Sequence, residues 1–296
     1  MTTNRINRCK PLLGTYVDVS IEADLDDEEI LDLSIDAFSA IAEVHEGLGF
    51  HNPDSELSEI NRWALLGIED PIAISEDMRR VMGLALSLSE ASDGLFDVTI
   101  APQLVDQGSL PNIHHGAIIV GSGASGSAVA GSGNWENVHL SDEGLSFSAP
   151  VLIDLGGIAK GYAVDKAIER IGAGKMDADV KLNINAGGDL YLSHWEEETV
   201  GVRYPDEPNK NHKMPMLAPA LATSACYFTE QDSVMIHPKS GEATVRGYSV
   251  SVFAEQCMLA DALTKLAFLN PRDTRVIRQY KGRAFMLDSH NGLLEL

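Results

Sequence analysis

The sequence predicts a mixed α+β fold, and three features of its 296 residues indicate this class. Residues 15–21 alternate apolar and polar side chains, which is the period of a half-buried strand. Two later segments repeat apolar residues at helical spacing directly after capping residues. Strands and helices then follow one another irregularly and without an internal repeat, so a regular doubly wound parallel sheet is less well supported.

The first two elements that the sequence predicts are a strand and a helix. The strand face that we expect to be buried carries Thr15, Val17, Val19 and Ile21. Asp26 followed by Glu29 resembles a capping box, which starts a helix. The core positions expected on this helix are Ile30, Leu31, Ile35, Phe38, Ile41 and Ala42.

A second helix begins after Ser75, a typical N-cap residue, and Gly94 lies beyond its end. Its expected core positions are Met78, Val81, Met82, Ala85 and Leu88. Further along, the pattern predicts strands at 151–155, 180–186 and 248–254. It predicts helices at 158–171 and 257–269. Residues 120–133 are rich in Gly and Ser and predict a loop.

Composition excludes several classes of function. The chain has 22 basic and 44 acidic residues, a formal charge of −22, so sequence-independent binding of nucleic acid through a basic face is excluded. No apolar run is long enough for a transmembrane helix, so we expect no stable membrane insertion. Three widely spaced cysteines predict neither a disulfide framework nor a zinc ribbon. With no signal peptide visible, we expect a cytoplasmic protein, although a periplasmic protein trimmed of its export signal would look the same.

Residues 153–165 carry the most informative chemistry. An apolar stretch leads into Gly156-Gly157 and then into a helix with Lys160 in its first turn. Glycines allow a close approach to a ligand, and free N–H groups at a helix start bind anions, so this arrangement suits a phosphate. A strand-to-helix turn with Gly for tight packing explains the same residues equally well.

Two further segments are suggestive. Asn185 to Asp189 places a Gly pair and a carboxylate after a strand, which alone is most often a hairpin or bulge. On the last predicted helix, Asp261 shares a face with Thr264 and Lys265. A carboxylate and a hydroxyl one turn apart are oxygen ligands of the kind Mg²⁺ prefers, whereas an Asp261–Lys265 surface pair is the simpler interpretation.

Together and in order, these segments resemble the ApbE family of flavin transferases. The similar segments are LGT at 13–15, HNPDSELSEIN at 51–61, GLFDVTIAP at 94–102, DLGGIAKGYAVD at 154–165, NAGGD at 185–189, LATS at 221–224 and PKSG at 238–241. They stay in register over about residues 12–270. One such motif would be weak evidence, but the complete set identifies the chain as a member of the family.

The resemblance implies a single domain over 1–296, with mixed sheets, helices and two lobes around a flavin cleft. Family members move FMN from FAD onto a Thr or Ser of a target protein, aided by Mg²⁺ at the pyrophosphate, and release AMP. Carried over by position, the flavin and pyrophosphate contacts are Leu13, His51, Phe96, Asp97, Asp154, Lys160 and Thr223. The metal ligands are Gly157, through its carbonyl, and Asp261.

Two departures from the family pattern matter. The metal helix usually reads Asp-x-x-x-Thr, but here Lys265 stands at the threonine position and the threonine is Thr264. Either Thr264 serves as a metal ligand from the preceding position, or metal affinity is reduced. The segment His-x-x-Asp-Pro has Val234 for its histidine and His237 for its aspartate. His237 is a candidate base for the acceptor hydroxyl, and equally a polar residue before a proline turn.

The expected activity is therefore Mg²⁺-dependent transfer of FMN from FAD, the substrate, to an acceptor protein with a Ser/Thr flavinylation motif. One alternative is an FAD-binding carrier or sensor with little or no transfer activity. Another is an FAD pyrophosphatase that uses water as acceptor and gives FMN and AMP. The two departures leave these alternatives open.

Overall fold

The computed structural model describes residues 3–113, 133–175, 180–207, 209–225, 235–244 and 247–296. The chain forms two compact units. The first, which we call the sheet unit, comprises residues 1–45, 158–227 and 246–296, and the second unit comprises residues 46–157 and 228–245. The predicted loop at 120–133 lies outside the described residues except for Gly133, and so does Cys226.

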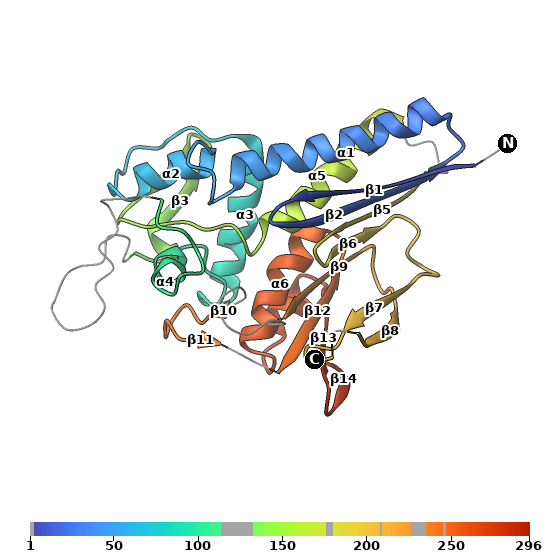
Figure 1. The fold of residues 1–296 in the computed structure, drawn as a ribbon. Coiled ribbons are helices and arrows are strands. Elements are labelled where there is room, and N and C mark those ends of the chain that lie inside the picture. The colour runs from blue at the N-terminus through green and yellow to red at the C-terminus, as the bar shows by residue number, and fades with distance from the viewer. Residues whose placement is uncertain (1–2, 114–132, 176–179, 208, 226–234, 245–246) are drawn as a thin grey trace. The chain divides into compact units, whose positions relative to one another are not determined.

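The sheet unit is built on an eight-stranded antiparallel sheet (Figure 1). In spatial order its strands are β1 (Asn4–Leu12), β2 (Thr15–Ala23), β5 (Lys181–Ala186), β6 (Asp189–Leu192), β9 (Ala220–Ala225), β12 (Tyr248–Ala254), β13 (Arg283–Asp288) and β14 (Gly292–Glu295). Val17, Val19 and Ile21 of β2 are buried, as the alternation predicts.

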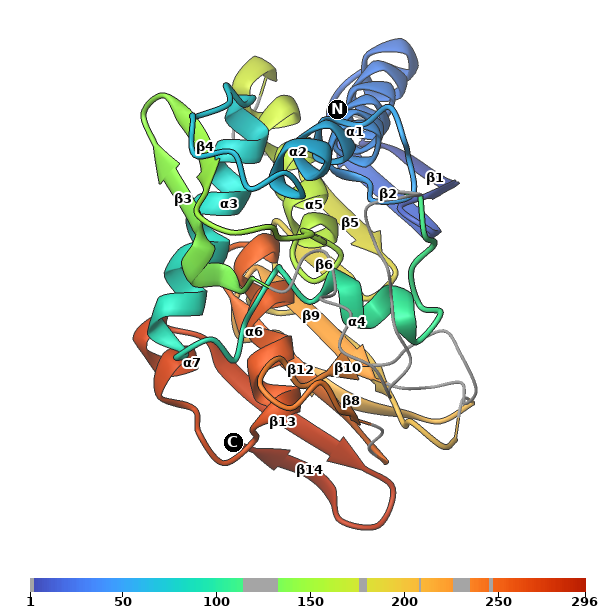
Figure 2. The same cartoon turned by 90° about the vertical axis from the view of Figure 1, so that its left-hand side faces the viewer.

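Helices cover one face of this sheet. They are α1 (Asp27–Leu48), α5 (Ala159–Lys175), α6 (Cys257–Leu269) and the short α7 (Arg275–Gln279). α5 packs against β5 and β6, and α6 packs against β9 and β12 (Figure 2). Three alanines, Ala222, Ala254 and Ala260, meet between α6 and the sheet, and their small side chains allow the helix to approach closely.

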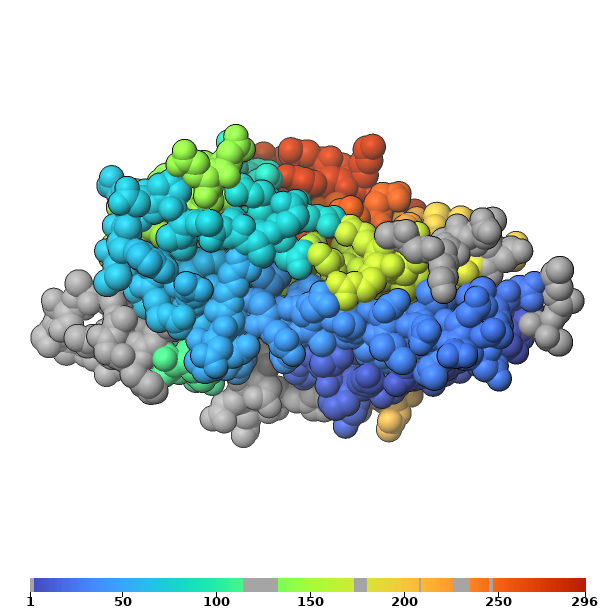
Figure 3. Space-filling view, turned by 90° about the horizontal axis from the view of Figure 1, so that it is seen from above, coloured from blue at the N-terminus to red at the C-terminus, as the bar shows by residue number. Residues whose placement is uncertain are grey.

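The other face of the sheet packs against a hairpin of β7 (Thr199–Arg203) and β8 (Asn211–Pro215). Its core includes Val202, Met214, Leu221 and Phe253. On the helical side, α1 and α5 lie side by side, as their blue and yellow-green surfaces show in Figure 3. Arg170 of α5 forms a bidentate ion pair with Glu43 of α1.

The second unit is made of short elements. They are α2 (Glu56–Ala64), α3 (Glu76–Ala91), α4 (Ala101–Asp106), a 3₁₀ turn (Trp135–Asn137), β3 (Val138–Ser141), β4 (Gly144–Phe147), β10 (Met235–Ile236) and β11 (Ala243–Thr244). β3 pairs with β4 and β10 with β11, both antiparallel.

Most of the predicted elements are confirmed. Asp26 and Glu29 form the expected capping box at the start of α1. Ser75 caps α3 by accepting from the N–H of Met78, and all five of the predicted core positions of this helix are buried. β12 and α6 have the predicted bounds. No helix in the described part of the chain is both long and apolar enough to cross a bilayer.

The predicted core face of α1 is partly wrong. Leu31 and Ile35 are exposed, at 40% and 46%. The buried stripe instead runs through Ile30, Leu33, Ala37, Phe38, Ile41 and Val44. Because successive residues turn by about 100° around a helix, Leu31 and Ile35 fall beside this stripe, on the solvent side.

The predicted strand at 151–155 is also wrong, because this buried segment joins no sheet ladder. Its backbone bonds to other partners. The Asn61 side chain accepts from the N–H of Ile153 at 2.8 Å and donates to the Ile153 carbonyl at 2.9 Å. Val151 donates to the Ala64 carbonyl and Asp154 to the Val98 carbonyl. An apolar run can therefore be buried without pairing, provided that its polar groups are satisfied in another way.

Candidate active site

Two tight turns lie at the same end of the sheet. Leu13-Gly14 connects β1 to β2, and Gly187-Gly188 connects β5 to β6. Leu13 has a φ of 56°, which is rare for a residue with a branched side chain. Backbone strain of this kind is often found at functional sites. Gly187 has a φ of 65°, and a Cβ there would lie 2.6 Å from Thr15 Oγ1, so the second turn packs directly against the start of β2.

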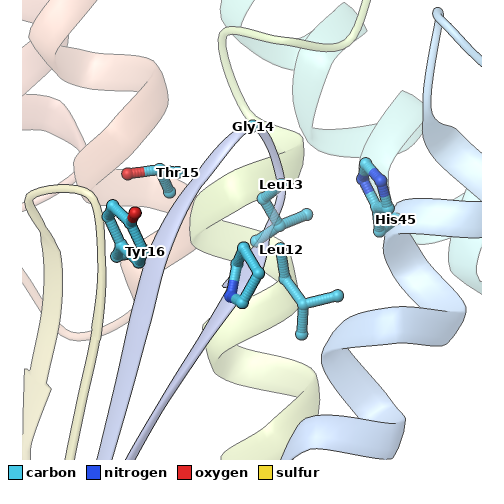
Figure 4. Close-up of a pocket in the computed structure, with 7 residues that line it drawn as sticks. Leu12, Leu13, Gly14, Thr15, Tyr16 and His45 are labelled. Carbon is cyan, nitrogen blue, oxygen red and sulfur yellow. The ribbon is translucent and has the colours of Figure 1, made fainter.

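A shallow pocket of about 380 Å³ opens at the first of these turns (Figure 4). Its lining residues are Pro11, Leu12, Leu13, Gly14, Thr15, Tyr16 and His45. Leu12 and Leu13 present apolar surface, whereas His45 of α1 supplies a polar edge. The predicted flavin contact Leu13 therefore lies in a concave surface rather than on a bare hairpin tip.

Three residues at the start of α5 lie directly against α6, and they are Lys160, Gly161 and Asp165. A Cβ at Gly161 would lie 2.5 Å from the Cys257 carbonyl carbon and 2.7 Å from Met258 N, so only glycine allows the two backbones to touch. The Asp165 carboxylate accepts from the N–H groups of Cys257 and Met258, both at 2.8 Å, and so caps α6. The close packing positions Lys160 beside Asp261.

Lys160 lies between two carboxylates of the sheet unit. Its Nζ is 3.4 Å from Asp189 Oδ2 and 3.6 Å from Asp261 Oδ2. Burial lowers the pKa of Lys160, but the two carboxylates outweigh it and raise that pKa above the usual lysine value. Lys160 is therefore a fixed positive charge at neutral pH.

The two carboxylates differ in charge state. Burial, reinforced by the negative charge of Asp261, raises the pKa of Asp189 to about 6. Burial also acts to raise the pKa of Asp261, but Lys160 and Lys265 outweigh it and hold the pKa below the usual value. Asp261 stays ionised through the physiological range, while Asp189 titrates just below it.

Lys265 and Thr264 complete this cluster. The Lys265 ammonium donates to Asp261 Oδ1, to the Asp261 carbonyl at 3.1 Å and to Thr264 Oγ1 at 3.2 Å. Thr264 Oγ1 donates to the Asp261 carbonyl at 2.7 Å and lies 2.6 Å from Ser224 Oγ of β9. The group at the Asp261 carboxylate is thus the Lys265 ammonium rather than the Thr264 hydroxyl.

Thr223 lies near this cluster along the chain but faces the other way. Its hydroxyl pairs with Ser251 of β12 at 2.8 Å. Thr223 shares a sheet face with Leu221, which contacts the β7–β8 hairpin, whereas Ser224 points to α6. The Thr223 side chain is therefore not brought together with Lys160 and Asp261, although its backbone lies beside Gly188.

The other predicted residues belong to the second unit. His51 is exposed, and its ring makes a T-shaped contact with the ring of Phe50. Phe96 is buried, and the Asp97 carboxylate accepts from the N–H and the hydroxyl of Thr99, at 2.8 and 2.7 Å. Burial raises the pKa of Asp97, against the opposing effect of these hydrogen bonds.

Asp154 and Gly157 end the segment that Asn61 holds, and both are half-buried. His237 follows β10, and its backbone bonds close the Pro238–Gly241 turn, through the N–H of Gly241 and the carbonyl of Glu242. Its Nδ1 is buried and finds no hydrogen-bond partner among the described residues. Val234, the other altered position, lies outside them.

The ApbE family model matches residues 13–286, which takes in nearly all of both units. The chain belongs to the ApbE family. Two relatives named FAD:protein FMN transferase are similar to it over their sequences. The protein of Vibrio cholerae is 27% identical, over 86% of this chain and 78% of its own length. The protein of Treponema pallidum is 24% identical, over 93% of this chain and 82% of its own length.

Solved ApbE structures have the same mixed α+β fold. The ApbE protein of Thermotoga maritima superimposes with a TM-score of 0.79 at 22% identity, over 99% of this chain and 97% of its own. The flavin transferase ApbE of Vibrio cholerae gives 0.77 at 21% identity, over 100% and 97%. The predicted fold class is thereby confirmed.

The residues expected to bind Mg²⁺ in this ApbE protein do not fit a metal as they are arranged. Asp261 Oδ1 accepts from Lys265, and Asp261 Oδ2 accepts from the Gly161 N–H at 3.2 Å and faces Lys160. Within the described ranges, no three His, Cys, Asp or Glu side chains gather as a metal-binding group. Gly157, the third expected ligand, belongs to the second unit.

Sequence reasoning did not assign roles to three residues of this site. Asp165 caps α6 across a separation of 92 residues, which no local pattern reveals. In the sequence Ser224 is only part of an ATS motif, and its bond to Thr264 depends on the packing of β9 against α6. Asp189 is the carboxylate of the GGD motif, but its ion pair with Lys160 depends on the three-dimensional packing of α5 beside β6.

Proposed function

We propose that this chain transfers the FMN moiety of FAD to a Ser or Thr hydroxyl of an acceptor protein and releases AMP. The observation that carries the proposal is the match to the ApbE family over residues 13–286. The two similar relatives, from Vibrio cholerae and Treponema pallidum, are both named for this activity. The geometry of the sheet unit supports it, because Lys160 supplies a permanent positive charge beside the α5 N-terminus, where an anionic pyrophosphate is favoured.

The reaction is a phosphoryl transfer. The acceptor hydroxyl oxygen bonds to the phosphorus on the FMN side of the pyrophosphate, and the P–O bond to AMP breaks with its electron pair going to AMP. The hydroxyl proton passes to a base. In such reactions, positioning and stabilisation of the charge that develops on the phosphate oxygens supply most of the catalysis. We assign to Lys160 the role of stabilising this developing charge.

His237 is the group that we assign as base. Its Nδ1 is buried and lacks a partner among the described residues, so one ring nitrogen is open to accept a proton. A neutral imidazole is a suitable base near pH 7. In the same proposal Leu13, His51, Phe96, Asp97, Asp154 and Thr223 contact the flavin or its pyrophosphate. The proposed reaction does not depend on Mg²⁺, because the Asp261 carboxylate already accepts a hydrogen bond from Lys265 and the Thr264 hydroxyl already donates one to the Asp261 carbonyl.

The test uses purified protein, FAD and an acceptor peptide containing Asp-Gly-x-Ser/Thr-Gly-Ala-Ser/Thr. We expect the peptide to gain the mass of FMN with one AMP released per label, measured by mass spectrometry and nucleotide chromatography. His237→Ala should slow transfer by about 10²-fold or more and leave FAD affinity unchanged, because only the proton acceptor is lost. His290→Ala, at an exposed histidine, is the matched control. Unlabelled peptide under conditions in which a typical ApbE enzyme works would refute the proposal.

A second candidate is an FAD carrier or sensor with little transfer activity. The engagement of Asp261 by Lys265 favours it, since the group expected to aid departure of AMP has lost its free carboxylate oxygen. The same assay separates the possibilities. Intact FAD retained on the protein indicates the carrier, whereas free FMN and AMP without labelled peptide indicate a pyrophosphatase.

A further inference from the structure

We propose that the Lys265 ammonium takes the place of a divalent metal on Asp261, so that this chain binds the pyrophosphate of its nucleotide without Mg²⁺. The inference rests on the proposed function for the identity of the nucleotide. The exclusion of a metal from Asp261 does not depend on it.

The hydroxyl at this position has no lone pair left for a metal. A hydroxyl offers one donor and two acceptor sites. Thr264 Oγ1 donates to the Asp261 carbonyl, so its contacts with Ser224 and Lys265 must use both acceptor sites. Thr264 therefore cannot become a metal ligand from the preceding position without breaking a bond that the fold supplies.

The carboxylate is equally engaged. Asp261 is 1% exposed, and each of its oxygens already has a cationic neighbour, Lys265 at Oδ1 and Lys160 at Oδ2. Mg²⁺ requires oxygens at about 2.0–2.1 Å in octahedral geometry. A metal at Asp261 would have to displace the ammonium, whose three N–H groups all have oxygen acceptors in this position.

Charge balance explains what Lys265 contributes to the site. With Lys160, Asp189 and Asp261 alone, the ionised cluster would carry one net negative charge and would repel a pyrophosphate. Lys265 brings the ionised cluster of four to zero. Because Lys265 shares the face of Asp261 one turn along α6, the helix itself holds this ammonium at the carboxylate. Lys265 acts through Asp261 as a positioning residue, and Lys160 is the residue to which we assign the phosphate contact.

The test begins with the metal alone. Mn²⁺ is titrated into FAD-free protein and followed by electron paramagnetic resonance. We expect no stoichiometric binding to the wild-type protein. Lys265→Thr, which places a hydroxyl four residues after Asp261, should create one Mn²⁺ site, and Asp261→Asn in that background should remove it. Lys213→Thr, at an exposed lysine of β8, is the matched control and should bind no Mn²⁺.

FAD affinity is then measured by flavin fluorescence in EDTA and in Mg²⁺. The wild-type affinity should differ by less than about twofold between the two conditions. The Lys265→Thr affinity should fall by about tenfold in EDTA, a change of about 1.4 kcal/mol, and recover with Mg²⁺. The control variant should behave as the wild type.

Two outcomes would overturn the inference. One is a stoichiometric Mn²⁺ site in the wild-type protein that Asp261→Asn abolishes, and this measurement stands even when Lys265→Thr does not fold. The other is wild-type FAD binding that requires Mg²⁺. Absence of FAD binding in both conditions would instead refute the proposed function, while the Mn²⁺ titration would still decide whether Lys265 excludes a metal.

Discussion

Replacing Gly161 with alanine tests whether the contact between α5 and α6 organises the site. In an ordinary helix this substitution stabilises by roughly 0.5–1 kcal/mol, because alanine loses less backbone entropy on folding. Here the new Cβ would lie 2.5 Å from the Cys257 carbonyl carbon and 2.7 Å from Met258 N. These are backbone atoms that cannot rotate away, so the two helices must separate.

The magnitude follows from two opposing effects. Overpacking a tight interior costs about 1–3 kcal/mol, and occasionally more when a backbone has to move. Subtracting the gain in helix propensity leaves a net loss of stability of about 0–2.5 kcal/mol for Gly161→Ala. Separation of the helices would also lengthen the 3.2 Å bond from the Gly161 N–H to Asp261 Oδ2. We therefore expect FAD affinity to fall together with stability.

Gly83→Ala is the matched control for this experiment. Gly83 also lies inside a helix, α3, but a Cβ there would meet only Leu140 Cδ2, at an ordinary 3.8 Å. We expect this variant to be more stable than the wild type by up to about 1 kcal/mol. Urea unfolding, followed by circular dichroism, measures both. A Gly161→Ala protein as stable as Gly83→Ala would refute the argument from backbone contact.

Two further predictions concern buried polar groups. Asn61→Ala leaves the N–H and carbonyl of Ile153 buried without their partners and should cost about 2–5 kcal/mol. Urea unfolding measures it, and a loss below about 1 kcal/mol would mean that 151–155 is held by packing alone. The pKa of Asp189 is about 6 in the folded protein and about 3.9 in the unfolded chain. Between these values the folded protein binds more protons than the unfolded chain, so the free energy of unfolding should decrease as the pH rises from about 4 to 6. Asp189→Asn should flatten that decrease in urea titrations; an unchanged slope would contradict the burial of an ionising Asp189.

The elements that sequence patterns predicted correctly are those whose signal is local. β12 and α6 have their predicted bounds because apolar spacing and flanking polar residues mark both. Ser75 and the buried stripe of α3 were predicted for the same reason. The error on α1 has a local cause too. Apolar residues outnumber the buried positions of that helix, so the composition alone could not separate Leu31 from Leu33.

What the sequence could not predict depends on partners distant along the chain. The 151–155 segment has the composition of a strand, but its hydrogen bonds go to Asn61, 92 residues earlier than Ile153. Asp165 has the sequence context of a surface carboxylate, and its partners on α6 follow 92 and 93 residues later. Local spacing alone indicates Lys160, Asp261 and an Asp261–Lys265 pair, but the structure was needed to show that this pair is not on the surface and lies beside Lys160 and Asp189.

A formal charge of −22 poses a question for any protein proposed to bind an anionic nucleotide. At physiological ionic strength the field of a surface charge is largely screened beyond about 8 Å, so distant acidic residues matter little at the binding position. Charges within a few ångströms decide the outcome, and there Lys160 and Lys265 balance Asp189 and Asp261. Both carboxylates are buried, so solvent cannot screen them, and a neutralising charge must lie within a few ångströms. Lys265 is already in that position. An acidic protein can therefore present a locally neutral cluster around Lys160, the residue to which we assign the phosphate contact, and the global charge sets the solubility of the chain rather than its choice of ligand.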